Sequence, residues 1–125
     1  MAKPTLLTVD DDPNVLKAIE RDLRARYGEK YRVLRANSGD AGLELLRELR
    51  VGNDAVALLL ADQRMPQMDG IGFLNEAREV YPDGKRALLT AYADTLPTVY
   101  RFENSKAEPA LYPFRCRVTD FAART

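Results

Sequence analysis

The chain has 125 residues, of which 46% are apolar and 30% are charged, as is typical of one globular domain with its own core. The 19 basic and 19 acidic residues cancel, so composition gives no electrostatic argument for nucleic acid or an anionic membrane as a partner. With no histidine and one cysteine, Cys116, the chain excludes Ser-His and Cys-His nucleophile pairs, His-ligated metals and a disulfide framework.

The first half of the chain predicts two strands, each followed by a helix. Residues 4–9 form an apolar run typical of a buried strand, and residues 13–27 have helical periodicity with Pro13 in the first turn. The apolar face of this helix is made of Val15, Leu16, Ile19 and Leu23. Residues 31–36 predict the second strand. Ser38 is placed to cap a second helix, whose inner face is made of Ala41, Leu45, Leu46 and Leu49.

The second half continues the alternation. Residues 55–61, AVALLLA, are the most continuously apolar run and predict a central strand that is covered on both faces. Residues 69–81 predict a third helix, and residues 85–91 a fourth strand. Residues 94–104 have a weaker helical pattern, and residues 109–112 predict a short fifth strand. Strands that alternate with helices over short connections favour a parallel sheet with right-handed crossovers.

Polar side chains stand where the predicted strands end. The first strand runs into Asp10, Asp11 and Asp12, the third ends at Asp62, and the fourth ends at Thr90. In an open parallel sheet, ligands bind at this carboxyl edge. Neighbouring carboxylates are costly unless a cation, a proton or a helix N-terminus offsets their charge. Mg²⁺ suits such a site, and a carboxylate beside it can attack phosphorus and become an aspartyl phosphate.

Three segments at these strand ends carry a resemblance to a known family. VDDD, ADQRMPQMDG and LLTA follow the first, third and fourth predicted strands, and together they resemble the receiver domain of bacterial two-component response regulators. The resemblance covers about residues 4–104. It implies an α/β flavodoxin-like fold, a doubly wound parallel five-stranded sheet of order 2-1-3-4-5 with helices on both faces. Residues 1–125 would then be a single receiver domain whose part from about 105 to 125 is atypical or truncated.

The resemblance also implies roles for single residues. Asp62 would be the phosphoacceptor, Thr90 would hydrogen-bond a phosphoryl oxygen, and Ala91 would leave room for it. The implied Mg²⁺ ligands are Asp10, acting chiefly through water, Asp11, Asp62 and the backbone carbonyl of Arg64. Asp12 and Asp69, by contrast, are expected to cap helices.

The last third departs from the family pattern. The family expects a Lys-Pro dipeptide after its fifth strand, and here Tyr112 precedes Pro113. A tyrosine can donate a hydrogen bond but carries no positive charge. Pro109 stands where the family usually has an aromatic switch residue. We therefore expect Tyr112 to occupy the usual lysine position and to weaken the response to phosphorylation.

Three functions follow from these observations. The first is a phosphorylatable signalling module that accepts a phosphoryl group on Asp62 from a histidine kinase or phosphotransfer protein and acts on an effector. The second is a pseudo-receiver, an interaction domain with little or no response to phosphate. The third is a haloacid-dehalogenase-like phosphatase with Asp10 as nucleophile, although Asn14 stands where that motif has Thr or Val.

The first of these functions is the expected one and makes the chain a signalling domain rather than an enzyme. At most, it would phosphorylate itself from small donors and dephosphorylate itself. The lone cysteine and the lack of a signal-peptide pattern favour a cytoplasmic location without membrane contact. No nucleic-acid partner is expected for this domain, and a homodimer is left open.

Overall fold

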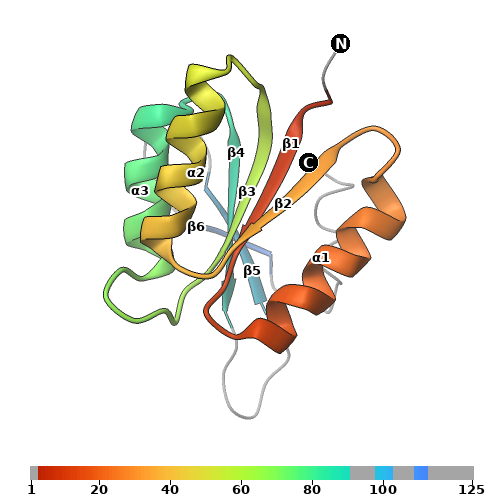
Figure 1. Cartoon of the computed structure of the whole chain (residues 1–125). Helices are drawn as coiled ribbons and strands as arrows, with labels where there is room; N and C mark the ends of the chain where they lie inside the picture. The colour runs from red at the N-terminus through yellow and green to blue at the C-terminus, as the bar shows by residue number, and fades with distance from the viewer. Residues whose placement is uncertain (1–2, 91–97, 103–108, 113–125) are drawn as a thin grey trace.

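The computed structural model describes residues 3–90, 98–102 and 109–112. Strands and helices alternate up to residue 90, after which two strands follow (Figure 1). The elements in chain order are β1 (Thr5–Val9), α1 (Pro13–Tyr27), β2 (Arg32–Ala36), α2 (Gly39–Val51), β3 (Val56–Asp62), α3 (Gly70–Val80), β4 (Lys85–Thr90), β5 (Thr98–Phe102) and β6 (Pro109–Tyr112). Every strand and helix predicted before residue 90 is present.

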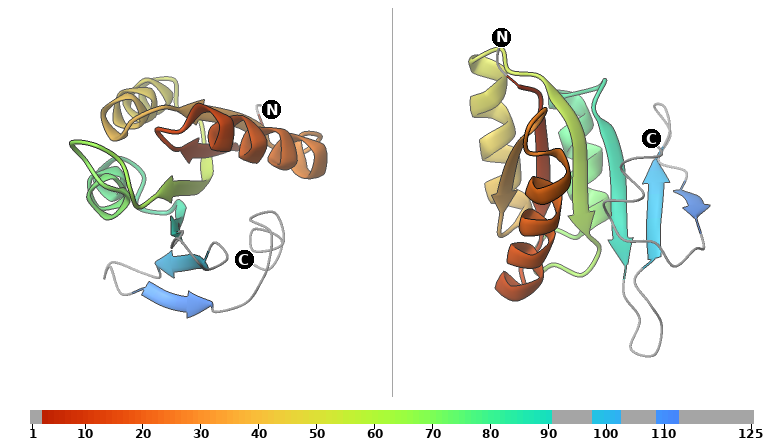
Figure 2. Two further views of the ribbon diagram at one scale, coloured as in Figure 1. Left: turned by 90° about the horizontal axis from the view of Figure 1, so that it is seen from below. Right: turned by 90° about the vertical axis from the view of Figure 1, so that its right-hand side faces the viewer.

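The first four strands form a parallel sheet in the order β2-β1-β3-β4. Helix α1 covers one face of this sheet, and α2 and α3 cover the other (Figure 2). This arrangement confirms the predicted flavodoxin-like α/β class. All strand carboxyl ends of the parallel part lie at one edge, which is the lower edge in Figure 1.

Each face of the sheet has its own apolar core. Leu59 of β3 packs with the buried residues of α2 and α3, whereas its neighbours Leu58 and Leu60 pack with α1. The prediction of a central strand covered on both faces is therefore confirmed. The inner face of α1 contains Leu16, Ile19 and Leu23, but Val15 is 38% exposed, so its predicted place in the buried stripe is wrong.

Two glycines allow close packing within the layer formed by α2 and α3. A Cβ on Gly42 of α2 would meet Cε1 of Phe73 of α3 at 2.7 Å, and one on Gly39 would meet Sδ of Met68 at 2.7 Å. Leu46 and Leu49 of α2 are buried as predicted, and Ala41 and Leu45 are partly buried against the same core. The loop before α3 and both helices thus share one tightly packed layer.

The predicted fourth helix is wrong where the structure describes it. Residues 98–102 form β5, which pairs antiparallel with β4, and the predicted fifth strand at 109–112 is β6, which pairs antiparallel with β5 instead of parallel with β4. The sequence TVYRF contains β-branched and aromatic residues that favour strands, and Pro97 precedes it. Pro109 begins the edge strand, a position where a missing N–H is tolerated.

The register across these strands changes the expected position of Tyr112. Asp62 pairs with Leu89, Leu89 with Val99, and Val99 with Tyr112, so the four Cα atoms lie in one row across the sheet. Three interstrand spacings of about 4.8 Å separate the ends of this row by roughly 14 Å. The backbone of Tyr112 is therefore one strand further from Asp62 than the predicted strand order would place it.

Candidate functional site

The three aspartates that follow β1 have three different surroundings. Asp10 is only 3% exposed and accepts a hydrogen bond from the backbone N–H of Asp12, with a distance of 2.9 Å from N to Oδ1. Asp11 is exposed. Asp12 caps α1, because its Oδ1 accepts from the backbone N–H of Asn14 at 2.9 Å and of Val15 at 3.4 Å. The prediction that Asp12 is a cap is thus confirmed.

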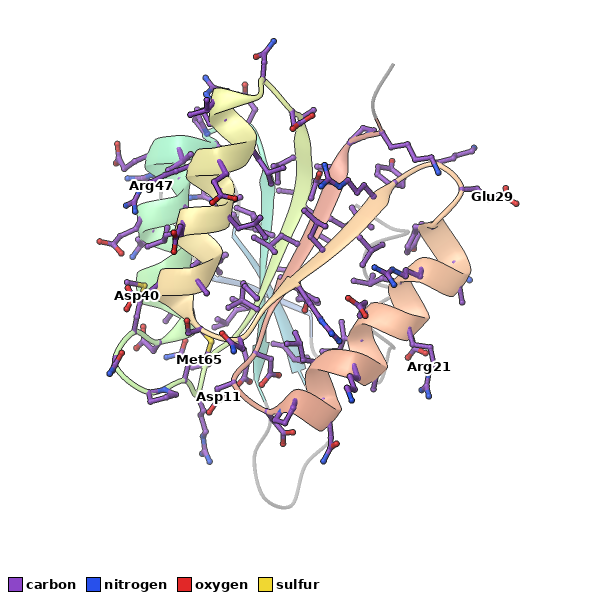
Figure 3. All side chains as sticks on the ribbon, viewed as in Figure 1. Asp11, Arg21, Glu29, Asp40, Arg47 and Met65 are labelled. Carbon is purple, nitrogen blue, oxygen red and sulfur yellow. The ribbon has the colours of Figure 1, made fainter. Side chains whose placement is uncertain are left out.

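The end of β3 brings a further carboxylate to this edge. Asp10, Asp11 and Asp62 each offer an oxygen atom, and these atoms lie within 4.8 Å of one another. The parallel pairing of β1 with β3 causes this proximity, since Val9 and Ala61 are register partners and the aspartates follow or end these strands. Figure 3 shows Asp11 at the same end of the sheet as the loop that carries Met65.

Burial is the main cause of the unusual electrostatics at Asp10. It raises the pKa of the Asp10 carboxyl from 3.8 to about 6, because water is excluded from the charged form. The hydrogen bond from the Asp12 backbone opposes this shift, and the negative charges of Asp62, Asp11 and Asp12 add to it. Without a cation, Asp10 therefore keeps its proton to a higher pH than an ordinary aspartate does.

Asp62 is perturbed in the same direction. Partial burial and then the charge of Asp11 raise the pKa of its carboxyl. Backbone hydrogen bonding from Arg64 and Gln63, together with the positive charge of Arg64, lowers it in part. A carboxylate held by backbone donors at a strand end is accessible for chemistry and oriented at the same time.

The loop between Asp62 and α3 is held close to the strand end. Asp69 caps α3, with its Oδ1 accepting from the backbone N–H of Gly72 at 2.8 Å. Gln67 adopts a positive φ of 68°, and Met65 is buried in the core shared with α2 and α3. A Cβ on Gly70 would meet the carbonyl oxygen of Asp62 at 2.5 Å, so this first helical position requires glycine.

Gln63 is a residue of this site that reasoning from the sequence did not single out. Its side-chain Oε1 accepts from the backbone N–H of Ile71 at 3.1 Å, and its Nε2 donates to Oδ2 of Asp69 at 3.3 Å. A glutamine next to an aspartate gives no signal in the sequence. Its role depends on the loop folding back so that residues 63 and 71 meet.

The donor set fits Mg²⁺. This ion takes one or two carboxylates together with water and phosphate oxygens, and the trio of Asp10, Asp11 and Asp62 offers carboxylates of graded exposure. Burial and neighbouring negative charges raise the pKa values of Asp10 and Asp62, so a bound cation would offset the cost of keeping these carboxylates ionised in the fold. The carboxylate oxygens of the site are the ligand type that a hard divalent cation prefers.

The remaining site residues predicted from the sequence have different outcomes. Asp69 caps a helix, as predicted. Thr90 ends β4, whose Leu89 pairs with Asp62, so its backbone lies at the expected edge. Ala91 lies outside the described residues. The assignment of Arg64 as a ligand through its carbonyl stays a prediction, as do the individual roles of Asp10, Asp11, Asp62 and Thr90.

Comparison with known proteins agrees with this fold. The model of the response regulator receiver domain matches residues 6–110. The hydrogenase transcriptional regulatory protein HoxA of Cupriavidus necator is 38% identical over 91 residues, which are 73% of this chain and 17% of that protein. The transcriptional regulatory protein AfsQ1 of Streptomyces coelicolor is 33% identical over 121 residues, which are 97% of this chain and 50% of that protein.

Solved structures of receiver domains also match this fold. A CheY-like response regulator receiver domain protein from Methanospirillum hungatei is 29% identical, with a TM-score of 0.60 over 74% of this chain and 68% of that chain. The chain thus belongs to the response regulator receiver domain family of two-component systems. Receiver domains are signalling domains rather than enzymes.

The chain spans at most half the length of the two curated relatives named above. No helix in the described ranges is long and apolar enough to cross a bilayer.

Proposed function

We propose that this chain is a phosphorylatable receiver that accepts a phosphoryl group on Asp62, with Mg²⁺ held by Asp10, Asp11, Asp62 and the backbone carbonyl of Arg64. The observation that carries the proposal is the convergence of three carboxylate oxygens within 4.8 Å at the carboxyl ends of β1 and β3. The family match supports the same function. The haloacid-dehalogenase-like alternative is not proposed, because the chain belongs to a different family.

The proposed reaction needs a partner protein that carries the phosphoryl donor. This chain has no histidine, so a phosphohistidine would come from a kinase or phosphotransfer protein. A carboxylate oxygen of Asp62 attacks phosphorus and forms an O–P bond, while the N–P bond of the phosphohistidine breaks and its electron pair stays on the imidazole nitrogen. Mg²⁺, when bound, supplies positive charge for the phosphoryl oxygens. Asp10 and Asp11 would hold and orient the Mg²⁺ ion. Thr90 is proposed to donate a hydrogen bond to a phosphoryl oxygen.

Intact-mass measurement after treatment with acetyl phosphate and Mg²⁺ tests the proposal. We expect the wild type to gain the mass of one phosphoryl group, labile to hydroxylamine as an acyl phosphate is. Asp62→Asn should stay folded and unmodified, and Asp83→Asn, an exposed acid in the turn before β4, is the matched control that should behave like wild type. A wild type that gains no mass, or a label that persists in Asp62→Asn, would overturn the assignment.

The second candidate is a pseudo-receiver, and the row of paired residues across the sheet favours it. The residue counted to the usual lysine position is a tyrosine, and its backbone lies three strands from Asp62. This candidate predicts Mg²⁺ binding without acyl phosphate, or acyl phosphate without any change in amide exchange at β4. Amide exchange of the phosphorylated protein at Leu88 and Leu89 separates it from the first candidate.

The partners belong to the same proposal. HoxA and AfsQ1 are named as transcriptional regulators and are much longer than the part that this chain matches. We propose that this chain receives its phosphoryl group from a cytoplasmic kinase pathway and passes its state to an effector. Self-phosphorylation from small donors, self-dephosphorylation and a homodimer are further parts of the proposal, which the mass measurement and sedimentation of both states would test.

A further inference from the structure

Gln63, the residue after Asp62, is hydrogen-bonded to four surrounding residues. Its backbone N–H donates to the carbonyl oxygen of Leu89 of β4 at 3.0 Å, and its own carbonyl oxygen accepts from the N–H of Gly70 at 3.2 Å. Its side chain reaches Ile71 and Asp69 through the two bonds described above, at 3.1 and 3.3 Å. The residue after the candidate phosphoacceptor is thus bonded to both β4 and α3.

The side chain of Gln63 makes two hydrogen bonds in addition to the one by which Asp69 caps α3. Asp69 already caps α3 through the N–H of Gly72. The bond from Ile71 to Gln63 satisfies a further N–H group of the first helical turn, and the bond to Asp69 ties the capping residue itself back to the residue that follows β3. Together these bonds close the loop of residues 64–68 at both of its ends.

From this geometry we propose that Gln63 is a positioning residue for the acidic site. By holding the loop at both ends, its side chain fixes the backbone that immediately follows Asp62, including the Arg64 carbonyl and the backbone groups of Arg64 that hydrogen-bond toward Asp62. The inference rests on the proposed function, because it concerns how well this site binds Mg²⁺ and accepts a phosphoryl group.

The reason is geometric. Mg²⁺ demands nearly ideal octahedral coordination, so a ligand oxygen displaced by a fraction of an ångström weakens binding. In-line attack by the Asp62 carboxylate has a similar requirement for orientation. A loop that is free to move at residue 71 would satisfy neither requirement as well as a closed loop does.

Two variants at Gln63 and one matched control test the inference. Gln63→Met keeps the length of the side chain and removes both of its hydrogen bonds. Gln63→Glu keeps the acceptor for the Ile71 N–H but loses the donor to Asp69. Gln67→Asn is the control, since it changes a glutamine of the same loop that makes none of these bonds, and asparagine tolerates its positive φ. The readouts are amide exchange at Ile71, the Mg²⁺ dissociation constant, and the phosphorylation rate with acetyl phosphate.

We expect Gln63→Met to speed exchange at Ile71 and to raise the Mg²⁺ dissociation constant about two- to tenfold, a change on the scale of the net contribution of a hydrogen bond. The phosphorylation rate should fall with it. Gln63→Glu should keep Ile71 protected, because it keeps the acceptor for that N–H. The Gln67→Asn control should match wild type in every readout.

Two outcomes would overturn the inference, and they are distinguishable. Gln63→Met with fast exchange at Ile71 but wild-type Mg²⁺ affinity and phosphorylation rate would show that these bonds serve only the helix. This result would leave the proposed function intact. A wild type that binds no Mg²⁺ would overturn the proposed function and the inference together.

Discussion

Gly70 lies against the backbone of Asp62 so closely that a Cβ at position 70 would be 2.5 Å from the Asp62 carbonyl oxygen. The same Cβ would also be 2.5 Å from Cδ1 of Leu88 on β4. The first residue of α3 therefore packs directly on the end of the strand that carries the candidate phosphoacceptor. The absence of a side chain at Gly70 allows the loop to close.

Gly70→Ala should therefore destabilise the fold. Because backbone as well as a core leucine must shift, we expect a loss of about 1–3 kcal/mol in the free energy of unfolding. Gly72→Ala is the matched control, since a Cβ there would meet Oδ1 of Asp69 at 3.1 Å and Met68 Cγ at 3.5 Å. Urea unfolding of both variants checks the prediction, and equal stabilities would contradict it.

Asp10 should make the metal-free protein less stable as pH rises. The unfolded carboxyl titrates near 3.8 and the folded one near 6, so between these values the folded state holds a proton that the unfolded state has released. The contribution of Asp10 to the free energy of unfolding therefore falls through this window, by about 3 kcal/mol at about 1.4 kcal/mol per pKa unit. Asp10→Asn should remove most of this loss and be the more stable protein above pH 6. Urea unfolding in chelator at several pH values, with Asp83→Asn as control, measures it.

Mg²⁺ should stabilise the wild type and stabilise Asp11→Ala much less. A ligand that binds only the folded state adds about 2 kcal/mol at tens of its dissociation constant. Asp11 is the exposed member of the trio, so its removal should take away a ligand without opening the core. Thermal melting with and without millimolar Mg²⁺ is the measurement. No shift in the wild type would exclude the metal site, and an equal shift in Asp11→Ala would exclude this residue as a ligand.

Asp12 should contribute to the stability of α1 and not serve as a metal ligand. Asp12→Ala removes the acceptor for Asn14 and Val15 and should cost about 1 kcal/mol, whereas Asp12→Ser keeps a cap and should cost little. The melting shift caused by Mg²⁺ should fall much less in both variants than in Asp11→Ala, because Asp12 acts on the site only through its charge. A shift in Asp12→Ser that falls as far as in Asp11→Ala would show that Asp12 is also a ligand.

Much of the acidic site could be predicted because it depends on local patterns. Asp10, Asp11 and Asp62 follow apolar runs that form parallel strands, and the topology alone brings such strand ends together. Burial differs among neighbours, however, and the contrast between buried Asp10 and exposed Asp11 follows from packing that no local pattern encodes. The loop-closing bonds of Gln63 are non-local in the same way.

The largest error in the prediction of the fold has a different cause. The weak helical pattern of residues 94–104 predicts a helix, whereas the β-branched and aromatic residues of Thr98–Phe102 favour the strand that the structure contains. Pairing with β4 stabilises this strand, and no local pattern encodes that pairing. The consequence extends to Tyr112, whose position depends on how many strands separate it from β4.

The separation of the two cores has a mechanical consequence. Met68 packs on Gly39, and Gly42 packs on Phe73, so the loop of residues 64–68, α2 and α3 are linked by close contacts. Helix α1 is attached to the opposite face through a separate set of residues. A displacement that starts in the loop should therefore move α2 and α3 together as one rigid body. Helix α1 should move less, because the sheet separates it from the core that α2 and α3 share.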